Sequence, residues 1–225
     1  RQYDIITYKL DSTGKQIWKS YYGGAGTQDA FICKTSDTSV YVGGVENTTS
    51  PYNKTANHML IIKIDTSNGA VLKHNKINFG DTAGYDEMDG IVPEKDGIYC
   101  GGWAQVTGNV GDYEIVFLLL DYNLNILNKD YFGDTVSNHA EHQDGHIVVD
   151  SNYVYGAGLW DGNTLFNNIG DGRDILAKFN RDSLTFVDSV LFGPTLSVAG
   201  DKQNALGSAI DGKYIYVTGY ANPTS

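Results

Sequence analysis

The sequence from Lys9 to Gly24 reads KLDSTGKQIWKSYYGG, and it contains the pattern that decides the fold. It begins with Lys-apolar-Asp, which closes an apolar strand, and continues through a short segment rich in Ser, Thr and Gly. A second strand then ends in an aromatic residue followed by Gly. Asp, Ser and Gly between two short apolar strands are typical of a β-hairpin turn. This stretch therefore predicts one antiparallel pair of strands.

The Lys-apolar-Asp element occurs four times, in intact or altered form, at spacings of 54, 56 and 59 residues. Each copy is followed by a strand ending in aromatic-Gly, then by Asp or Asn before a small residue, and then by a Tyr-bearing strand closed by Gly. The four copies are Lys9-Leu10-Asp11, Lys63-Ile64-Asp65, Leu119-Leu120-Asp121 and Lys178-Phe179-Asn180. A period of this size with four short strands per unit is typical of a β-propeller.

The order of the elements predicts three complete units with half a unit at each end. The half units are expected over about 3–22 and 204–220, and the complete units over about 29–79, 89–132 and 144–192. Pairing the two halves would hide the outer sheet edges. We therefore predict one all-β domain over 1–225, a β-propeller of four four-stranded blades closed by pairing N-terminal and C-terminal half-blades. Its repeats span about 1–57, 58–112, 113–173 and 174–225. The alternative is a segment whose further blades come from other sequence or from a second chain.

The composition excludes some classes of partner. The 225 residues carry a net charge of −11, whereas binding to nucleic acid or to anionic lipid needs a basic surface. The longest apolar run, Ile115–Leu120, is far too short to span a membrane. Asn47 and Asn53 begin two N-glycosylation sequons, which favour an extracellular or cell-surface location. Cys33 and Cys100 could bridge neighbouring blades or be two small buried side chains, and the sequence leaves both readings open.

Connection lengths predict where a ligand binds. The turns within each hairpin are short, and the other connections are long and irregular. In a four-stranded meander the long connections all emerge on one face. The long segments are 46–57, 80–88, 104–112, 133–143, 161–173 and 193–203. Long loops on a rigid scaffold commonly form binding surfaces, so we expect the binding surface on this face.

The first unit carries the fullest version of the repeat. Its residues are Asp4, Lys9-Leu10-Asp11, Gly14, Trp18, Tyr22-Gly23-Gly24, Asp29-Ala30 and Tyr41-Val42-Gly43-Gly44. In these residues the chain resembles bacterial and archaeal β-propeller repeat proteins, whose units read like Asp-x4-Lys-Leu-Asp-x2-Gly-x3-Trp-x3-Tyr-Gly-Gly. The similarity extends along the chain but weakens where Leu119 and Asn180 replace Lys and Asp. The resemblance implies a secreted or surface-attached protein that is rarely an enzyme, and it places the Asp-small strand innermost in each blade.

Aromatic residues at the ends of the Tyr-bearing strands are the first candidate binding site. Trp103, Trp160 and Tyr220 follow the closing Gly of successive units, and Asp161 and Asn163 lie close by in the sequence. A flat ring for the C–H face of a sugar, with polar groups for its hydroxyls, is the usual arrangement in sugar recognition. The alternative is that these rings pack between blades.

Two polar sets are further candidates. Asp29, Asp89, Asp144 and Asn204 begin the innermost strands, and in a closed ring they would surround the channel mouth and could hold Ca²⁺. The alternative is that they accept hydrogen bonds from their own loops. His139, His142 and His146 lie within eight residues and could bind Zn²⁺, although they could equally form a polar loop. We expect no obligatory cofactor.

No nucleophile or phosphate-binding motif occurs in the sequence. We therefore expect a non-catalytic extracytoplasmic binding module that uses the long-loop face to bind a glycan or a protein. A structural subunit of a surface layer or filament, which would self-assemble, is the alternative. A carbohydrate-active enzyme is the second alternative.

Overall fold

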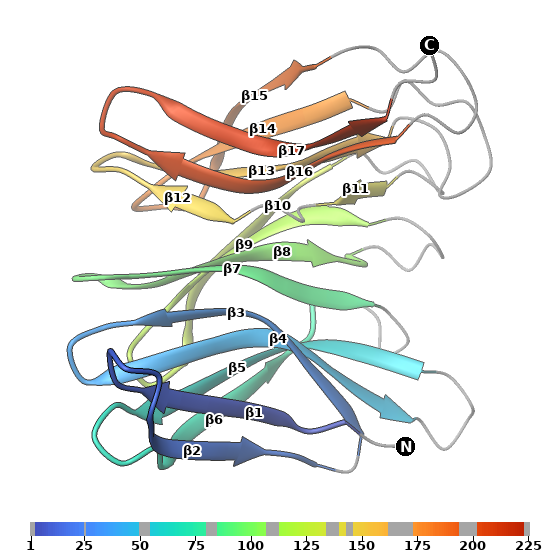
Figure 1. The fold of residues 1–225 in the computed structure, drawn as a ribbon. Helices are drawn as coiled ribbons and strands as arrows, with labels where there is room; N and C mark the ends of the chain where they lie inside the picture. The colour runs from blue at the N-terminus through green and yellow to red at the C-terminus, as the bar shows by residue number, and fades with distance from the viewer. Residues whose placement is uncertain are drawn as a thin grey trace.

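The computed structural model describes residues 3–24, 26–49, 55–79, 85–106, 113–133, 140–142, 146–161, 173–193 and 202–222. Their regular structure consists of β-strands, which confirms the all-β class. The strands form antiparallel sheets in which neighbours along the chain pair with one another (Figure 1). Among these residues there is no helix with the length and apolarity needed to cross a bilayer.

Two strands form the N-terminal pair, and three larger sheets follow. The N-terminal pair is β1 (Ile5–Leu10) and β2 (Gln16–Tyr22). The first sheet is β3 (Thr27–Thr35), β4 (Ser39–Thr49), β5 (Thr55–Asp65) and β6 (Val71–Ile77). The second sheet is β7 (Asp86–Glu94), β8 (Gly97–Ala104), β9 (Glu114–Leu120) and β10 (Ile126–Phe132).

The third sheet differs from the first two because its opening strand is divided. It contains β11 (Ala140–His142) and β12 (Ile147–Val149), both paired with β13 (Tyr153–Asp161), then β14 (Arg173–Asn180) and β15 (Phe186–Phe192). The C-terminal pair is β16 (Lys202–Ile210) and β17 (Ile215–Asn222). The predicted order of half unit, three complete units and half unit therefore agrees with the observed strands.

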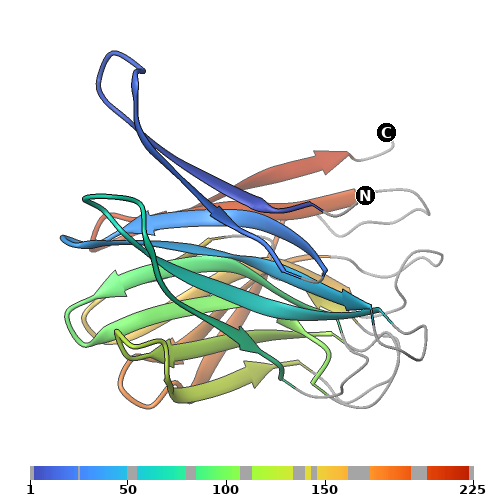
Figure 2. The same cartoon turned by 90° about the horizontal axis from the view of Figure 1, so that it is seen from below.

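The predicted four-bladed β-propeller is wrong, because no closed ring of sheets is found. In the described part of the chain β1 pairs only with β2, and β17 pairs only with β16. The sheets form a stack, with the N-terminal pair at the bottom of Figure 1 and the third sheet and C-terminal pair at the top. Seen from below, the N-terminal pair is an outer hairpin beyond the first sheet (Figure 2). The repeat specifies the strands of each sheet, but packing between sheets sets the angle between them.

Apolar side chains fill the spaces between successive sheets. Ile5 and Trp18 of the N-terminal pair pack with Leu60 and Ile62 of the first sheet. The opposite face of the first sheet packs on the second sheet, and the opposite face of the second sheet packs on the third. Strand β9 is therefore buried along its whole length, which explains its unbroken apolar sequence.

The Asp of the Lys-apolar-Asp element organises the hairpin turn that follows it. Asp121 Oδ1 accepts hydrogen bonds from the backbone N–H groups of Asn123 and Asn125, each at 2.8 Å. Asp11 makes the same contacts with Thr13 and Lys15, at 2.8 and 3.0 Å. The element is thus a turn signal, as expected for Asp at this position.

The Lys of the same element ties one sheet to the next. Lys9 Nζ donates to the carbonyl of Thr66 at 2.8 Å, and Lys63 Nζ donates to the carbonyl of Tyr122 at 2.8 Å. Both acceptors lie in the hairpin turn of the following sheet. The repeated Lys therefore has a structural role in stacking.

A recurring β-bulge explains the glycines that close the Tyr-bearing strands. The pairing register shifts between Ala30 and Ile32, between Met88 and Gly90, and between Ala205 and Gly207. A Cβ on Gly44 would lie 2.0 Å from the carbonyl oxygen of Asp29, and a Cβ on Gly102 would lie 1.9 Å from that of Glu87. Only glycine lets the two backbones approach this closely.

Candidate functional site

The two ends of the sheets differ in their connections. The short-turn end carries the hairpin turns, for example those at 36–38, 66–70 and 121–125. The long-loop end is where β4, β8 and β13 end and where β5, β9 and β14 begin. Much of the predicted long-loop face lies outside the described residues, so the site is built here from the strand ends that support it.

Trp103 lies at the long-loop end of β8, but it is buried, with 8% of its surface exposed. Its ring stacks on Tyr85 at a centroid distance of 4.8 Å and an interplanar angle of 12°. Tyr113 meets its edge at 4.9 Å and 90°. Tyr85 is 36% exposed, so Tyr85 presents an accessible ring and Trp103 supports it from behind. Sequence reasoning missed Tyr85 because it stands outside the repeated motif.

The other predicted aromatic residues are not brought to this place. Trp160 and Asp161 belong to β13 of the third sheet, where their backbones pair with Glu141 and Ala140. Tyr220 belongs to β17 of the C-terminal pair and is 48% exposed. Asn163 lies outside the described residues. The three predicted rings therefore come from three different sheets.

The predicted channel mouth is not found, because the described sheets do not close into a ring around a channel. Asp29 is exposed in β3, Asp89 is 7% exposed in β7, and Asn204 pairs with Tyr220 in β16. Asp144 lies outside the described residues. The register also corrects the sequence alignment: Asp29 and Asn204 precede the bulge, and the residue at their position in β7 is Glu87. Asp89 is the bulged residue two positions later.

The predicted histidine cluster is only partly described. His146 is half-buried, and its Nδ1 lies 3.1 Å from the carbonyl oxygen of Asp89. His142 pairs through its backbone with Leu159 in β13, and His139 lies outside the described residues. Within the described ranges no group of three or more His, Cys, Asp or Glu side chains could hold a metal ion.

The sequon and cysteine predictions can be placed more simply. Asn47 lies inside β4, paired with Thr27 and Asn57, and so does not belong to a loop as expected; Asn53 lies outside the described residues. Cys33 is an exposed free thiol and Cys100 a buried free thiol. Burial raises the pKa of Cys100 well above its usual value.

Three polar residues form a row across the first sheet at the long-loop end. In the pairing register Gln28 of β3 lies opposite Glu46 of β4, and Glu46 lies opposite His58 of β5. We call these three residues the polar row. Gln28 and Glu46 are each 1% exposed. A buried polar row in the middle of a sheet is costly unless its groups are hydrogen-bonded.

Glu46 meets its partners from two other strands. Lys76 of β6 forms an ion pair with Glu46 Oε1, and the hydroxyl of Tyr22 donates to Glu46 Oε2 at 3.2 Å. Burial and the neighbouring Glu46 charge raise the pKa of Tyr22 far above its usual value. The carboxylate is thus held in place by a cation on one oxygen and a neutral phenol on the other.

Gln28 and His58 supply the remaining hydrogen-bonding capacity. No described residue is recorded as a partner of the buried Gln28 side-chain amide. Its Nε2 and Glu46 Oε1 converge on Gly24, from whose ideal Cβ position they lie 3.4 and 3.3 Å. Burial and the charge of Lys76 lower the pKa of His58, so its imidazole is neutral at pH 7 and can both donate and accept.

The second sheet places the Tyr85 ring and a buried carboxylate, Asp86, at the same end. Tyr85 is joined to Asn57 of β5 by an isolated bridge, and its side chain contacts those of Asn57 and Glu87. Side chains alternate along a strand, so Asn57 and His58 point to opposite faces of the first sheet, and the polar row faces the N-terminal pair. In the second sheet Asp86 is 1% exposed and accepts hydrogen bonds from the N–H groups of Phe79 at 3.0 Å and Gln105 at 3.2 Å. Burial nevertheless raises the pKa of Asp86 to about 6.

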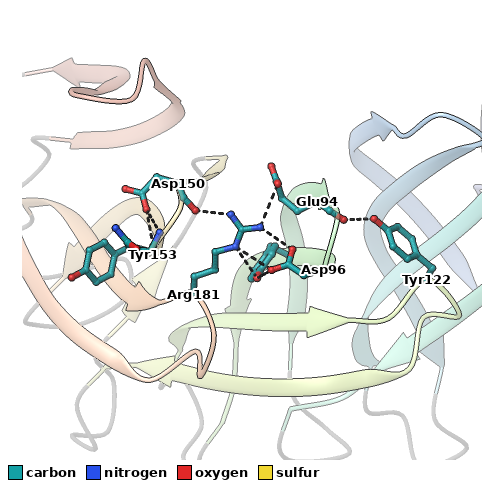
Figure 3. A network of polar contacts seen from close by, with 8 residues as sticks. Glu94, Asp96, Tyr122, Asp150, Tyr153 and Arg181 are labelled. Atoms are coloured by element: carbon teal, nitrogen blue, oxygen red, sulfur yellow. Dashed lines mark hydrogen bonds and ion pairs between the residues drawn. The ribbon is translucent and has the colours of Figure 1, made fainter.

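The short-turn end holds a different polar group, centred on Arg181 (Figure 3). Arg181 Nη1 donates to the carbonyl of Asp150 at 2.7 Å, and Nη2 donates to Asp96 Oδ1 at 2.8 Å. Its Nε donates to the hydroxyl of Tyr99 at 3.2 Å. Arg181 lowers the pKa of Asp96, and Asp96 raises that of Arg181. Because its partners come from two sheets, this group acts as a link between them.

Compared with models of protein families and with curated proteins, the sequence matches none. The site therefore has to be interpreted from its own geometry. It combines one exposed ring, backed by a second ring, with the amide and the carboxylate that the exposed ring contacts.

Proposed function

We propose that the chain is a non-catalytic, extracytoplasmic binding module that takes a glycan at the long-loop end of the first and second sheets. The observation that carries the proposal is the Tyr85 ring, held parallel to buried Trp103 and in contact with the side chains of Asn57 and Glu87. A sugar has apolar C–H faces and hydroxyls that need donors and acceptors. A flat ring beside an amide and a carboxylate matches both requirements.

The rigidity of the site supports this proposal. Tyr85 is fixed on one face by Trp103, and Tyr113 meets the edge of Trp103. Groups already held in place lose little conformational freedom when a ligand binds, which favours affinity. The net charge of −11 favours a neutral or cationic glycan over a strongly anionic one.

The test is binding of the chain to an array of immobilised glycans, followed by titration calorimetry with the best one. Tyr85→Ala should weaken binding about tenfold, which corresponds to about 1.4 kcal/mol, and should leave the circular dichroism spectrum unchanged. Tyr131→Ala, which removes a 41% exposed ring from β10, is the matched control and should bind as the wild type does. Equal affinity of the wild type and Tyr85→Ala, or absence of any glycan binding, would contradict the proposal, and turnover of a glycan would contradict its non-catalytic part.

A second candidate function, that of a self-assembling structural subunit, is favoured by a separate observation. Within the described ranges, the N-terminal and C-terminal pairs each have an open strand edge and several exposed apolar side chains. Open edges with apolar faces tend to pair with other strands.

A further inference from the structure

The three larger sheets share one pairing rule, and this rule predicts a partner for the open edges of β1 and β17. In all three larger sheets the second strand pairs antiparallel with the third, in one register. The register aligns Tyr41 with Lys63, Tyr99 with Leu119 and Tyr155 with Lys178. Strand β17 has Tyr216 at the tyrosine position but no third strand beside it in the described residues, and β1 has Lys9 at the lysine position but no second strand.

Burial at matching positions shows what each edge lacks. Tyr41 and Tyr99 are each 1% exposed, whereas Tyr216 is 56% exposed. Leu60, Ile62 and Ile64 of β5 are at most 1% exposed. Ile6, Tyr8 and Leu10, at the same positions of β1, are 40%, 51% and 54% exposed. The two pairs thus have the apolar side chains of interior sheets without the neighbours that would cover them.

Charge complementarity joins the same two edges. In the third sheet Lys178 Nζ lies 3.7 Å from the ring centroid of Tyr153. Burial alone would raise the pKa of Asp150, but hydrogen bonds and the charge of Lys178 lower it overall.

The C-terminal pair has the same hydrogen bonds between an Asp and two tyrosines as the third sheet. Asp211 accepts from the N–H of Tyr214 at 2.9 Å and from the hydroxyl of Tyr216 at 2.8 Å. The third sheet has the same contacts at Asp150, from Tyr153 at 2.7 Å and Tyr155 at 3.0 Å. The cation beside Tyr214 is Lys213 of the pair's own turn, at 4.8 Å from the ring centroid, and in the described residues no lysine from a third strand lies opposite Tyr216.

We propose that β17 of one copy pairs antiparallel with β1 of a second copy, in the register that places Tyr216 opposite Lys9. The two pairs then form one four-stranded sheet, β16–β17–β1–β2, shared between the copies. Lys9 can serve both contacts, since Lys63 donates to the carbonyl of Tyr122 while lying 6.0 Å from the Tyr41 ring centroid. This inference is independent of the proposed glycan site.

The shared sheet would continue the stack without a break. Tyr41 and Tyr99, which match Tyr216, pack toward the following sheet, and Leu60 and Ile62, which match Ile6 and Tyr8, pack toward the preceding pair. Tyr216 would therefore be covered by the first sheet of the second copy, and Ile6 and Tyr8 by the third sheet of the first copy. Each buried aromatic side chain covers roughly 150–250 Å². Covering the exposed parts of these side chains, together with the sheet faces that would meet them, contributes to the area of about 1,000 Å² that a specific interface requires.

The first test is the solution mass of the chain, measured by light scattering over a concentration series. The wild type should form dimers or longer assemblies, and Tyr216→Lys should shift it to a monomer of 24.6 kDa with an unchanged circular dichroism spectrum. Tyr131→Lys, on a fourth strand away from both edges, is the matched control and should assemble as the wild type does. A wild type that stays monomeric at every concentration, or assembly that Tyr216→Lys leaves intact, would overturn the proposal.

The second test fixes the register, in a Cys33→Ser background that removes the exposed thiol. Thr7→Cys and Thr218→Cys are made in separate chains, so that a disulfide between them must join two copies. The proposed register places these two residues opposite each other, and mixing the two variants under oxidising conditions should give a crosslinked pair. Thr7→Cys mixed with Val217→Cys, one residue out of register and on the opposite face, should crosslink much less. Equal crosslinking in both mixtures would overturn the register.

Discussion

The second sheet and the C-terminal pair are built from the same repeat, yet their side chains lie in opposite environments. Tyr99 in β8 is 1% exposed, and Tyr216, at the same position in β17, is 56% exposed. Both hydroxyls donate to an Asp in the preceding turn, Tyr99 to Asp96 three residues before it and Tyr216 to Asp211 five residues before it. The difference comes from the third strand and the next sheet, which β8 has and which β17 lacks among the residues that the structure describes. Burial in this molecule is therefore decided by neighbouring sheets, whereas the turn geometry is decided by local sequence.

The largest expected difference is in the free energy of unfolding lost when an aromatic ring is removed from the second sheet or from the C-terminal pair. Phe117 is fully buried in β9, and its ring centroid lies 4.3 Å from that of Phe179 in the third sheet. Phe117→Ala should lower the free energy of unfolding by about 3–5 kcal/mol because it leaves a cavity between two sheets. Tyr216→Ala, at low protein concentration, should lower it by under about 1 kcal/mol. Urea unfolding measures both, and similar losses would show that the C-terminal pair is covered in solution.

The glycines at the bulges should show a smaller contrast. A Cβ on Gly102 would lie 1.9 Å from the carbonyl oxygen of Glu87, so Gly102→Ala must displace the backbone. We expect a loss of about 1–3 kcal/mol. Gly207 of the C-terminal pair, which follows the bulge in β16 and matches Gly90 of β7, is the comparison, because a Cβ there would meet only the Thr218 methyl group at 3.2 Å. Gly207→Ala should have a clearly smaller effect in the same unfolding experiment, and the reverse order would contradict the account of the bulge.

The Arg181 group at the short-turn end should contribute less to the free energy of unfolding than the residues above. Arg181→Ala removes hydrogen bonds to the carbonyl of Asp150, to Asp96 and to Tyr99, and should lower the free energy of unfolding by about 1–2 kcal/mol. Lys213→Ala, in the C-terminal pair, removes a cation that lies 4.8 Å from the Tyr214 ring centroid, and should change it by at most about 0.5 kcal/mol. A double-mutant cycle of Arg181→Ala with Asp96→Ala should show coupling, and strict additivity would contradict the link.

The smallest expected effect is a change in pH dependence. The pKa of Asp86 is raised by burial to about 6, above its unfolded value of 3.8. Its contribution to stability is therefore full below about pH 4 and is lost as the pH rises through about 6. Asp86→Asn should remove this component, so that stability changes less between pH 4.5 and 7.5 than in the wild type. Asp188→Asn, at an exposed carboxylate, is the control, and a profile unchanged by Asp86→Asn would refute the assignment.

The sequence predicts the strands well because their signals are local. Asp11 and Asp121 mark hairpin turns through their own side chains, and the apolar run of β9 reflects burial on both faces. Closure of a ring was wrongly predicted because it depends on the angle between stacked sheets. That angle is set by packing across the interfaces, which no repeated residue encodes.

The candidate site was predictable only in part. Trp103 lies at the long-loop end, but the exposed ring beside it is Tyr85, because stacking buries the tryptophan. Asp89 was aligned with Asp29, but Asp89 is the bulged residue of β7, whereas Asp29 lies two positions before the bulged residue of β3. Gln28, Glu46 and His58 are far apart in the sequence and meet only across three strands, so the polar row needed the register to be seen.

The pairing of neighbours along the chain has a consequence for biosynthesis. Each larger sheet consists of one continuous stretch of sequence, so the first sheet is complete before β7 has left the ribosome. A nascent chain can therefore fold sheet by sheet, with each finished sheet as a surface for the next. Such an order also protects a protein of similar repeats from pairing the wrong copies, because the correct partner strand is always the next one to be synthesised.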